Sequence, residues 1–211
     1  MAKSKAAAGR TRWKRFGLAL IPTTVVISGL MVAAANGAVP MAFAISGTAF
    51  KVSGDKMVAT DVVQYGNIAK TGSGNIDDAQ PTIYSGFAHA EFDNLCQSVK
   101  IPFPLNIKIK GHDSVVMVIK SGGKSEATDM VADLSSLKGD ATFNGVQIGI
   151  DAKTTDKGPL AHPPVPSGMF GQQVNEVVVI NPRQIVYGVS AASFRLPSLD
   201  LSVNFDNREC F

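Results

Sequence analysis

The residues that come closest to a catalytic pattern are three neighbours, His112, Asp113 and Ser114, with His89 as a second candidate base. Serine hydrolysis needs an exposed nucleophile on a tight turn, a base beside it and an oxyanion hole. The chain contains no G-x-S-x-G sequence, and neighbours in an extended strand point to opposite faces. The spacing therefore favours a solvated turn, with an unorthodox site built on Ser114 as the alternative.

Spacings that would bind a metal or a cofactor are absent from the sequence. The three histidines lie far apart, and neither H-x-x-x-H nor C-x-x-C occurs. The acids at Asp77–Asp78 and at Asp129 and Asp133 do not form a calcium-binding loop with its closing Glu. No phosphate-binding glycine loop is found either. The sequence therefore predicts neither a metal nor a cofactor and favours a non-enzymatic protein.

An apolar stretch, residues 16–44, separates two regions of different chemistry and contains no charged residue. As a helix, such a stretch can cross the hydrocarbon core of a bilayer, which is about 30 Å thick. The preceding residues 1–15 hold six Lys or Arg and no acid, and the positive-inside rule keeps them in the cytoplasm. We therefore predict a basic cytoplasmic tail (1–15), a transmembrane segment (16–44) and an extracytoplasmic domain (45–211).

The same stretch also has features of a cleaved signal peptide. Ala42-Phe43-Ala44 has the small-x-small pattern of a cleavage site, and Pro40 would end the helix before it. However, Gly17 to Ala35 is a run of 19 uncharged residues, which is nearer to a span than to a signal core of roughly 7–15 residues. The pattern favours a single-pass signal anchor in the cell membrane, with secretion after cleavage at Ala44 as the alternative.

The distribution of charge argues against nucleic acid as a partner. The net charge is +3, but six of the 20 Lys and Arg lie in residues 1–15, where none of the 17 acids lies. Residues 16–211 therefore carry 14 basic against 17 acidic side chains, a net charge of −3. The basic excess belongs to the membrane flank, where anionic headgroups attract it. It indicates the membrane lipid bilayer as a partner.

Two cysteines, Cys96 and Cys210, both follow the apolar stretch. An even number of cysteines in an oxidising compartment predicts a disulfide, here one that joins the C-terminal end to the middle of the domain. The alternative is a pair of buried thiols. An extracytoplasmic domain and a disulfide are mutually consistent predictions.

Beyond Ala44 the apolar residues alternate with a period of two, which predicts an all-β domain. No amphipathic helix follows residue 45, and residues 153–171 are too rich in Pro and Gly to form one. We expect a repetitive β-sandwich or a short β-solenoid-like domain. The expected strands cover residues 45–52, 57–65, 83–92, 99–110, 115–120, 129–133, 142–151, 174–180, 184–189 and 194–205.

Four phenylalanines, Phe50, Phe92, Phe143 and Phe194, each lie in an expected strand, one or two residues after an alanine. Their spacings are 42, 51 and 51 residues, and a period near 50 is compatible with stacked or sandwiched hairpin units. The rings either line an extended apolar groove that holds a lipid or fill one shared core. The shared core is the simpler interpretation.

Several short sequence motifs, spread over nearly the whole chain, resemble those of a family of uncharacterised exported proteins in Streptomyces and related actinobacteria. They include Arg12–Phe16, Asn94-Leu95-Cys96-Gln97-Ser98, Phe170-Gly171-Gln172-Gln173 and Ala192–Leu196. The resemblance implies an actinobacterial cell envelope and an unknown function. Some members carry an automatic label of cholesterol esterase, which implies a lipid or sterol-ester hydrolase as an alternative.

We therefore expect a non-enzymatic cell-envelope protein, anchored in the membrane, whose β domain binds a lipid or an envelope or membrane protein partner. The hydrolase is one alternative. A structural protein that assembles into a surface layer through exposed strand edges is another, because unpaired edges accept further strands. A homo-oligomer is compatible with the first and third of these functions.

Overall fold

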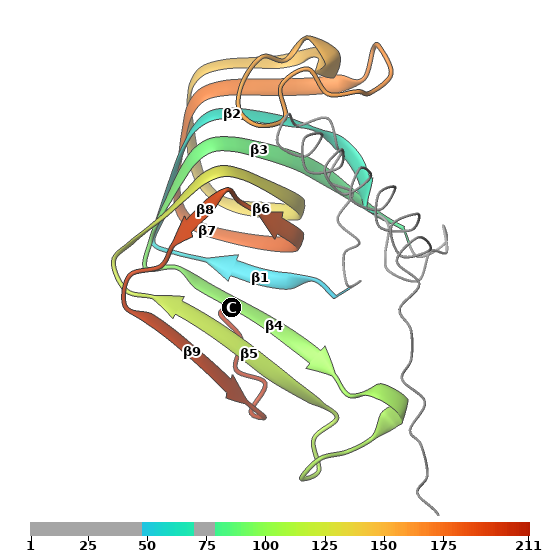
Figure 1. Ribbon diagram of the computed structural model, residues 1–211, viewed down its shortest axis with the longest axis vertical. Helices are drawn as coiled ribbons and strands as arrows, with labels where there is room; N and C mark the ends of the chain where they lie inside the picture. Colours follow the sequence, from blue (N-terminus) through green and yellow to red (C-terminus); the bar gives the residue numbers. More distant parts are fainter. Residues whose placement is uncertain (1–47, 70–78) are drawn as a thin grey trace, which may run out of the picture. The chain divides into compact units, whose positions relative to one another are not determined.

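Alternating apolar and polar residues form long strands in the computed structural model, which describes residues 48–69 and 79–211 (Figure 1). Two short 3-10 helices, η2 (Pro104–Asn106) and η3 (Ala152–Thr154), interrupt them. The strands are β1 (Phe50–Ser53), β2 (Lys56–Ala69), β3 (Gln80–Asp93), β4 (Cys96–Pro102), β5 (Ser114–Ser121), β6 (Lys124–Asp151), β7 (Phe170–Ser190), β8 (Ser193–Arg195) and β9 (Leu199–Asn204).

These strands form one nine-stranded sheet in the order β8-β6-β3-β2-β7-β1-β4-β5-β9, with a further pairing between β6 and β7. The prediction of an all-β domain is confirmed. The expectation of a repetitive β-sandwich or a short β-solenoid-like domain was wrong, because the described strands belong to one hydrogen-bonded sheet rather than to the two sheets of a sandwich. Their named pairings are antiparallel, unlike the stacked coils of a solenoid.

The chain divides into two units, Met1–Phe43 and Ala44–Phe211, and the sheet belongs to the second. The predicted cytoplasmic tail and transmembrane segment, residues 1–44, lie outside the described residues. Within residues 48–69 and 79–211, no helix has the length and apolarity needed to cross a bilayer.

Strand β7 connects the two halves of the sheet because it changes partner along its length. Residues up to Ile180 pair with β2, and residues from Arg183 pair with β1. At the change, Asn181 has a positive φ of 50° and its N–H donates to the Asp55 carbonyl at 2.8 Å. The sequence Asn181-Pro182-Arg183 predicts a break between two strands. The structure instead keeps one strand that bends there.

Strand β6 also changes partner, from β3 in its first part to β7 in its second. Register shifts occur between Asp133 and Leu134, between Leu134 and Ser136, and between Lys138 and Asp140. Such bulges bend a strand and increase its twist, and in Figure 1 both β6 and β7 turn sharply midway. The pairings β6–β3, β3–β2, β2–β7 and β7–β6 consequently form a closed circuit.

The main core lies on one side of this circuit. It includes Val52, Met57, Val62, Phe87, Phe92, Met130, Leu134, Val174, Val179 and Val186, all buried. Burying such a side chain stabilises the fold by about 1.5–3 kcal/mol. Alanines leave room for these larger neighbours: Ala59, Ala90 and Ala127 lie opposite one another across β2, β3 and β6 and are fully buried.

The expected irregular segment between Asp151 and Phe170 packs back onto the sheet. Leu160, Val165 and Met169 lie against a second cluster of Val63, Tyr65 and Ala152. The Asp151 carboxylate accepts hydrogen bonds from the Gly168 and Lys153 N–H groups, at 2.9 and 3.0 Å. These two hydrogen bonds, of which the one from Gly168 has the larger effect, hold the pKa of Asp151 below its usual range. Because the bond from Gly168 joins the two ends of the segment, the Asp151 carboxylate closes it.

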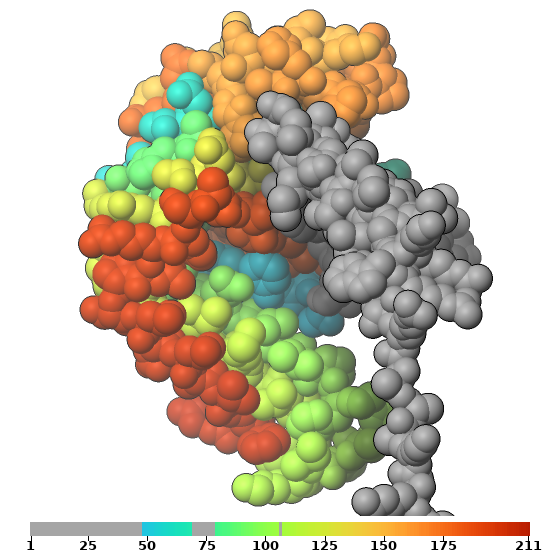
Figure 2. All heavy atoms as spheres, viewed as in Figure 1, coloured from blue at the N-terminus to red at the C-terminus, as the bar shows by residue number. Residues whose placement is uncertain are grey.

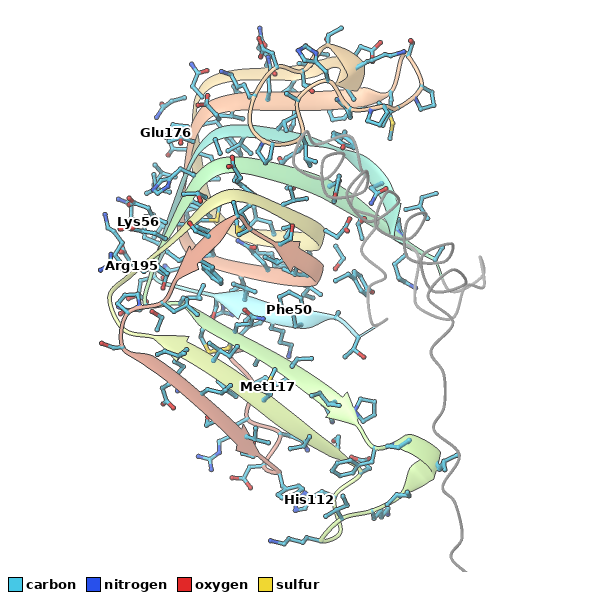
Figure 3. All side chains as sticks on the ribbon, in the orientation of Figure 1. Phe50, Lys56, His112, Met117, Glu176 and Arg195 are labelled. Carbon is cyan, nitrogen blue, oxygen red and sulfur yellow. A yellow bond between two sulfur atoms is a disulfide. The ribbon has the colours of Figure 1, made fainter. Side chains whose placement is uncertain are left out.

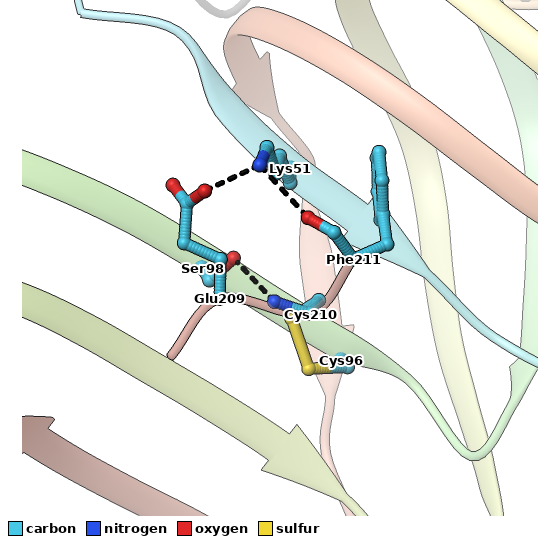
Figure 4. A network of polar contacts seen from close by, with 6 residues as sticks. All are labelled: Lys51, Cys96, Ser98, Glu209, Cys210 and Phe211. Carbon is cyan, nitrogen blue, oxygen red and sulfur yellow. Dashed lines mark hydrogen bonds and ion pairs between the residues drawn. A yellow bond between two sulfur atoms is a disulfide. The ribbon is translucent and has the colours of Figure 1, made fainter. Parts of the chain in front are cut away.

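The C-terminal segment is fastened to β1 and β4 (Figure 4). Cys96 and Cys210 form the predicted disulfide, with their Cα atoms 5.8 Å apart. The Cys210 N–H donates to the Ser98 hydroxyl at 3.0 Å. The Lys51 ammonium pairs with the Glu209 carboxylate and donates to the Phe211 carbonyl at 2.8 Å. One face of β1 and β4 is thereby covered by the end of the chain.

We predict that the double variant Cys96→Ser, Cys210→Ser loses about 4 kcal/mol of unfolding free energy. The disulfide joins residues 114 positions apart, and closing so long a loop restricts the unfolded chain strongly. Urea denaturation measures the loss. The control Ser98→Ala removes a single hydrogen bond and should cost about 1 kcal/mol. A double variant no less stable than this control would contradict the prediction.

Candidate functional site

The residues closest to a catalytic pattern are not arranged for hydrolysis. Ser114 begins β5, is only 3% exposed, and donates its hydroxyl hydrogen to Asp113 Oδ1 at 2.8 Å. This hydrogen bond is the main cause that holds the pKa of Asp113 below its usual range. The His112 ring lies against Phe205, with centroids 5.2 Å apart. Ser114 is therefore partnered by its own neighbour.

The other candidate base, His89, belongs to a different part of the sheet. Four strands separate β3 from β5 in the strand order. His89 Nε2 lies 3.3 Å from Glu91 Oε1, and the other carboxylate oxygen of Glu91 lies 2.8 Å from Lys124 Nζ. The hydrogen bond from Lys124, and to a smaller extent the one from His89, lower the pKa of Glu91. This cluster is a surface ion-pair network, and it does not meet Ser114.

The structure separates the four phenylalanines of the expected groove. Phe92 is a core residue, and Phe50 is half-buried against the same core. Phe143 and Phe194 are exposed. They are the two end residues of one row of paired residues across the sheet, with Phe143 opposite Val177 and Phe194 opposite Ala127. Two of the rings thus pack in the core and two lie at the surface, and the spacing that relates them does not bring them into one lining.

A continuous apolar face instead extends over the last four strands of the sheet. Residues directly opposite in antiparallel strands project to the same side. Val203 is opposite Met117, Met117 opposite Val99, and Val99 opposite Phe50, and Leu201 is opposite Ile119. We call these six residues, together with Leu199, the apolar face. Figure 3 labels Phe50 and Met117 on neighbouring parts of it.

The alternation of side chains puts Lys51, Ser98 and Val118 on the opposite side of the same strands. That is the side on which Lys51 and Ser98 contact the C-terminal segment. The C-terminal segment therefore covers one side of these strands, and the apolar side chains project from the other.

Strand β9 ends the sheet and exposes three large apolar side chains. Among the described strands it pairs only with β5. Leu199, Leu201 and Val203 are 55%, 58% and 63% exposed. Its remaining edge offers backbone N–H and C=O groups to a further strand. The alternating sequence predicted one strand over residues 194–205, but the structure divides this range into β8, which pairs with β6, and β9, which pairs with β5. The place of β9 at the end of the sheet depends on pairing across distant parts of the chain.

The connection between β4 and β5 is a second exposed apolar feature. Its sequence predicts strand as far as Lys110, but β4 ends at Pro102 and η2 follows. Backbone bonds close the connection, from Phe103 N–H to the Asp113 carbonyl at 2.8 Å and between Ile109 and His112 at 2.9 and 3.0 Å. Leu105, in η2, is 90% exposed and has a φ of 59°, a conformation that costs a bulky residue about 1–3 kcal/mol.

A buried carboxylate lies between β2, β3 and β6. Asp133 Oδ1 accepts hydrogen bonds from Asn67 Nδ2 at 2.9 Å and Thr82 Oγ1 at 3.1 Å. The rings of Tyr65 and Tyr84 meet edge to face nearby, 5.7 Å apart. Burial is the main cause that raises the pKa of both tyrosines, and neighbouring groups that include Asp133 raise it further. No motif in the sequence identifies this network, because its members come from three strands.

Asp133 is also one of the acids considered above for calcium. Within residues 48–69 and 79–211, no three His, Cys, Asp or Glu side chains gather into a group that could hold a metal ion. Asp77 and Asp78 lie outside the described residues. The hydrogen bonds of Asp133 make it a structural carboxylate that ties β2 and β3 to β6.

The chain belongs to a family of unknown function, DUF6230, whose model matches residues 46–211. The match covers the strands of the sheet, both cysteines and the apolar face. Neither the curated proteins nor the solved structures contain a match to the chain. The site must therefore be interpreted from its own geometry.

We predict that Asp133→Asn lowers the unfolding free energy by roughly 2 kcal/mol, because hydrogen bonds to a buried charged acceptor are strong. Removing the charge also makes ionisation of Tyr84 easier. A raised tyrosine pKa stabilises the fold below its ordinary value of about 10, and this contribution is lost as the pH rises through the folded value. In the variant Tyr84 should therefore ionise at lower pH, and the stability lost between neutral and alkaline pH should be smaller than in the wild type.

Urea denaturation and phenol absorbance during an alkaline titration measure the two effects. Asp140→Asn is the control, since Asp140 lies on β6 but is exposed. Equal stability and equal titration curves for the two variants would contradict a buried network centred on Asp133.

Proposed function

We propose that this chain is a non-enzymatic, membrane-anchored protein of an actinobacterial cell envelope whose β domain binds a protein partner outside the membrane. The partner that the geometry favours is a second copy of the chain, which adds its β9 to the open edge of β9. The observation that carries the proposal is the combination of an edge with which no described strand pairs and three exposed apolar side chains on the same strand.

The sequence of β9, Leu199-Asp200-Leu201-Ser202-Val203-Asn204, is suited to pairing with itself. In an antiparallel pair about a two-fold axis at Leu201, each Leu199 faces the partner's Val203 and the two Leu201 residues face each other. Each Asp200 then faces the partner's Ser202, so the only charge on the strand meets no like charge. Opposed apolar pairs contribute about 0.2–1 kcal/mol each.

Pairing of this kind uses the same strand on both subunits and is therefore closed. An isologous contact produces a dimer and leaves no further copy of the same edge. The proposed dimer is thus favoured over an extended surface layer, which would need a second, different contact. It joins the apolar faces of two domains into one larger apolar surface.

The other functions considered for this chain receive less support from the geometry. A lipid groove lined by the four phenylalanines would need rings that the fold separates, with Phe92 in the core and Phe194 at the surface. A hydrolase based on Ser114 would need to free a buried hydroxyl from Asp113. The open β9 edge needs no such rearrangement.

We predict that Leu201→Cys forms an intermolecular disulfide in the full-length protein in its membrane, because the two-fold axis brings the two positions opposite each other. Non-reducing electrophoresis detects the covalent dimer. The matched control is Ile148→Cys, since Ile148 on β6 is similarly exposed. This control should remain monomeric at the same protein density.

Leu201→Lys provides the complementary test, because it places two like charges opposite each other on the axis. We expect the dimer, measured by light scattering of the full chain in detergent, to weaken at least tenfold, while Ile148→Lys leaves it unchanged. Circular dichroism verifies that both variants remain folded. A strictly monomeric wild type without cross-linking at position 201 would refute the proposed dimer.

A further inference from the structure

The β4–β5 connection carries a pattern of side chains that the β9 edge does not explain. We define the basic apolar loop as residues Ile101–Lys110. Four of its large apolar side chains are exposed, with Leu105 the most exposed of those identified in the described residues. The four are Ile101, Leu105, Ile107 and Ile109. In a protein that has enough apolar residues for a core, such clustering marks an interaction site.

Lysines accompany these apolar residues. Lys108 lies between Ile107 and Ile109 in the sequence. Lys110 follows Ile109 in the turn that the Ile109–His112 bridge closes, with a φ of 51°. Lys100 directly precedes the loop, and the nearest acid after it in the sequence is Asp113. The loop is therefore amphipathic and positively charged, although residues 16–211 as a whole are net negative.

Backbone hydrogen bonds hold the loop in the conformation that exposes these side chains. Phe103, Ile107 and Ile109 all donate backbone hydrogen bonds within the connection. Leu105 has a positive φ and is 90% exposed. Lys110 and His112 lie against the Phe205 ring, 5.9 and 5.2 Å from its centroid, which fastens the loop beside the end of β9.

Figure 2 shows the loop, in green, at the lower end of the described sheet next to the last residues of β9, in red. In Figure 3, His112 lies at the same end. The loop is thus presented at one end of the strands, where a flat surface can reach its apolar and basic side chains.

We propose that the basic apolar loop docks on an anionic phospholipid bilayer, with Leu105, Ile107 and Ile109 inserted at the boundary of headgroups and acyl chains. Apolar insertion together with basic residues at the headgroups is the combination that binds interfacial segments to membranes. The lysine stems follow the apolar side chains inward while their ammonium groups stay at the phosphates. This binding is independent of the proposed β9 dimer and uses different residues.

The test uses the full-length chain in vesicles, with a fluorescent reporter at position 105 of the loop. Trp13 is the only tryptophan, so Trp13→Phe provides a silent background in which Leu105→Trp is introduced. The vesicles contain phosphatidylglycerol and phosphatidylcholine in equal amounts, with brominated acyl chains as the quencher. Ile148→Trp in the same background is the matched control, because Ile148 is exposed on β6.

We expect bromine to quench the tryptophan of the Leu105→Trp variant severalfold more than that of the Ile148→Trp variant. The quenching should fall severalfold in vesicles of phosphatidylcholine alone and when Lys108→Gln and Lys110→Gln are added. It should persist with Leu201→Lys, so that failure of the dimer leaves this result intact. Circular dichroism verifies the fold of every variant.

Three results would overturn the proposal. The first is equal quenching of the two reporters, which would mean that the loop has no special contact with the bilayer. The second is quenching that does not depend on phosphatidylglycerol or on the lysines. The third is a blue-shifted but unquenched reporter at position 105, which would mean that a protein surface covers the loop.

Discussion

The change of partner along β7 is the constraint on which the rest of the structure depends. One edge of β7 pairs first with β2 and then with β1, while its other edge follows β6. The buried Pro182 lies at the change, and the Gly54 N–H donates to its carbonyl at 3.3 Å. A proline cannot donate to a ladder, so it is accommodated where one partner strand has ended and the next has not begun.

This arrangement gives the domain two chemically different parts. The circuit of β2, β3, β6 and β7 pairs its strands on both sides and encloses most of the core. Strands β1, β4, β5 and β9 extend from β7 as an open sheet, and this extension must end in an edge. The disulfide and the Lys51–Glu209 ion pair hold the C-terminal segment over one of its faces. The apolar face and the β9 edge are what this covering leaves accessible.

Local patterns in the sequence predicted those features that depend on neighbouring residues. Alternation identified the all-β domain, and the two cysteines beyond the apolar stretch predicted the disulfide. The sequence around Pro182 was interpreted as a break between strands, because a proline ordinarily interrupts a ladder. Only the pairing of β7 with two different strands allows the strand to continue there, and that pairing joins residues far apart in the chain.

The candidate surfaces were harder to predict for the same reason. Phe50, Phe92, Phe143 and Phe194 have similar local sequences, yet the rows of the sheet put Phe92 in the core and Phe194 at the surface. Burial of a strand residue depends on its neighbours across the sheet, which sequence spacing does not specify. The sequence around Leu105 predicted a strand as far as Lys110, and only the structure shows that β4 ends at Pro102 and that an exposed connection follows.

The most direct test of the central claim is amide hydrogen exchange in the full-length protein at several protein concentrations. If two copies pair through β9, the amides of Leu199–Asn204 that do not bond to β5 become protected as concentration rises, while those of β2 and β3 do not change. Equal exchange of the β9 amides at all concentrations up to the highest attainable would contradict the account.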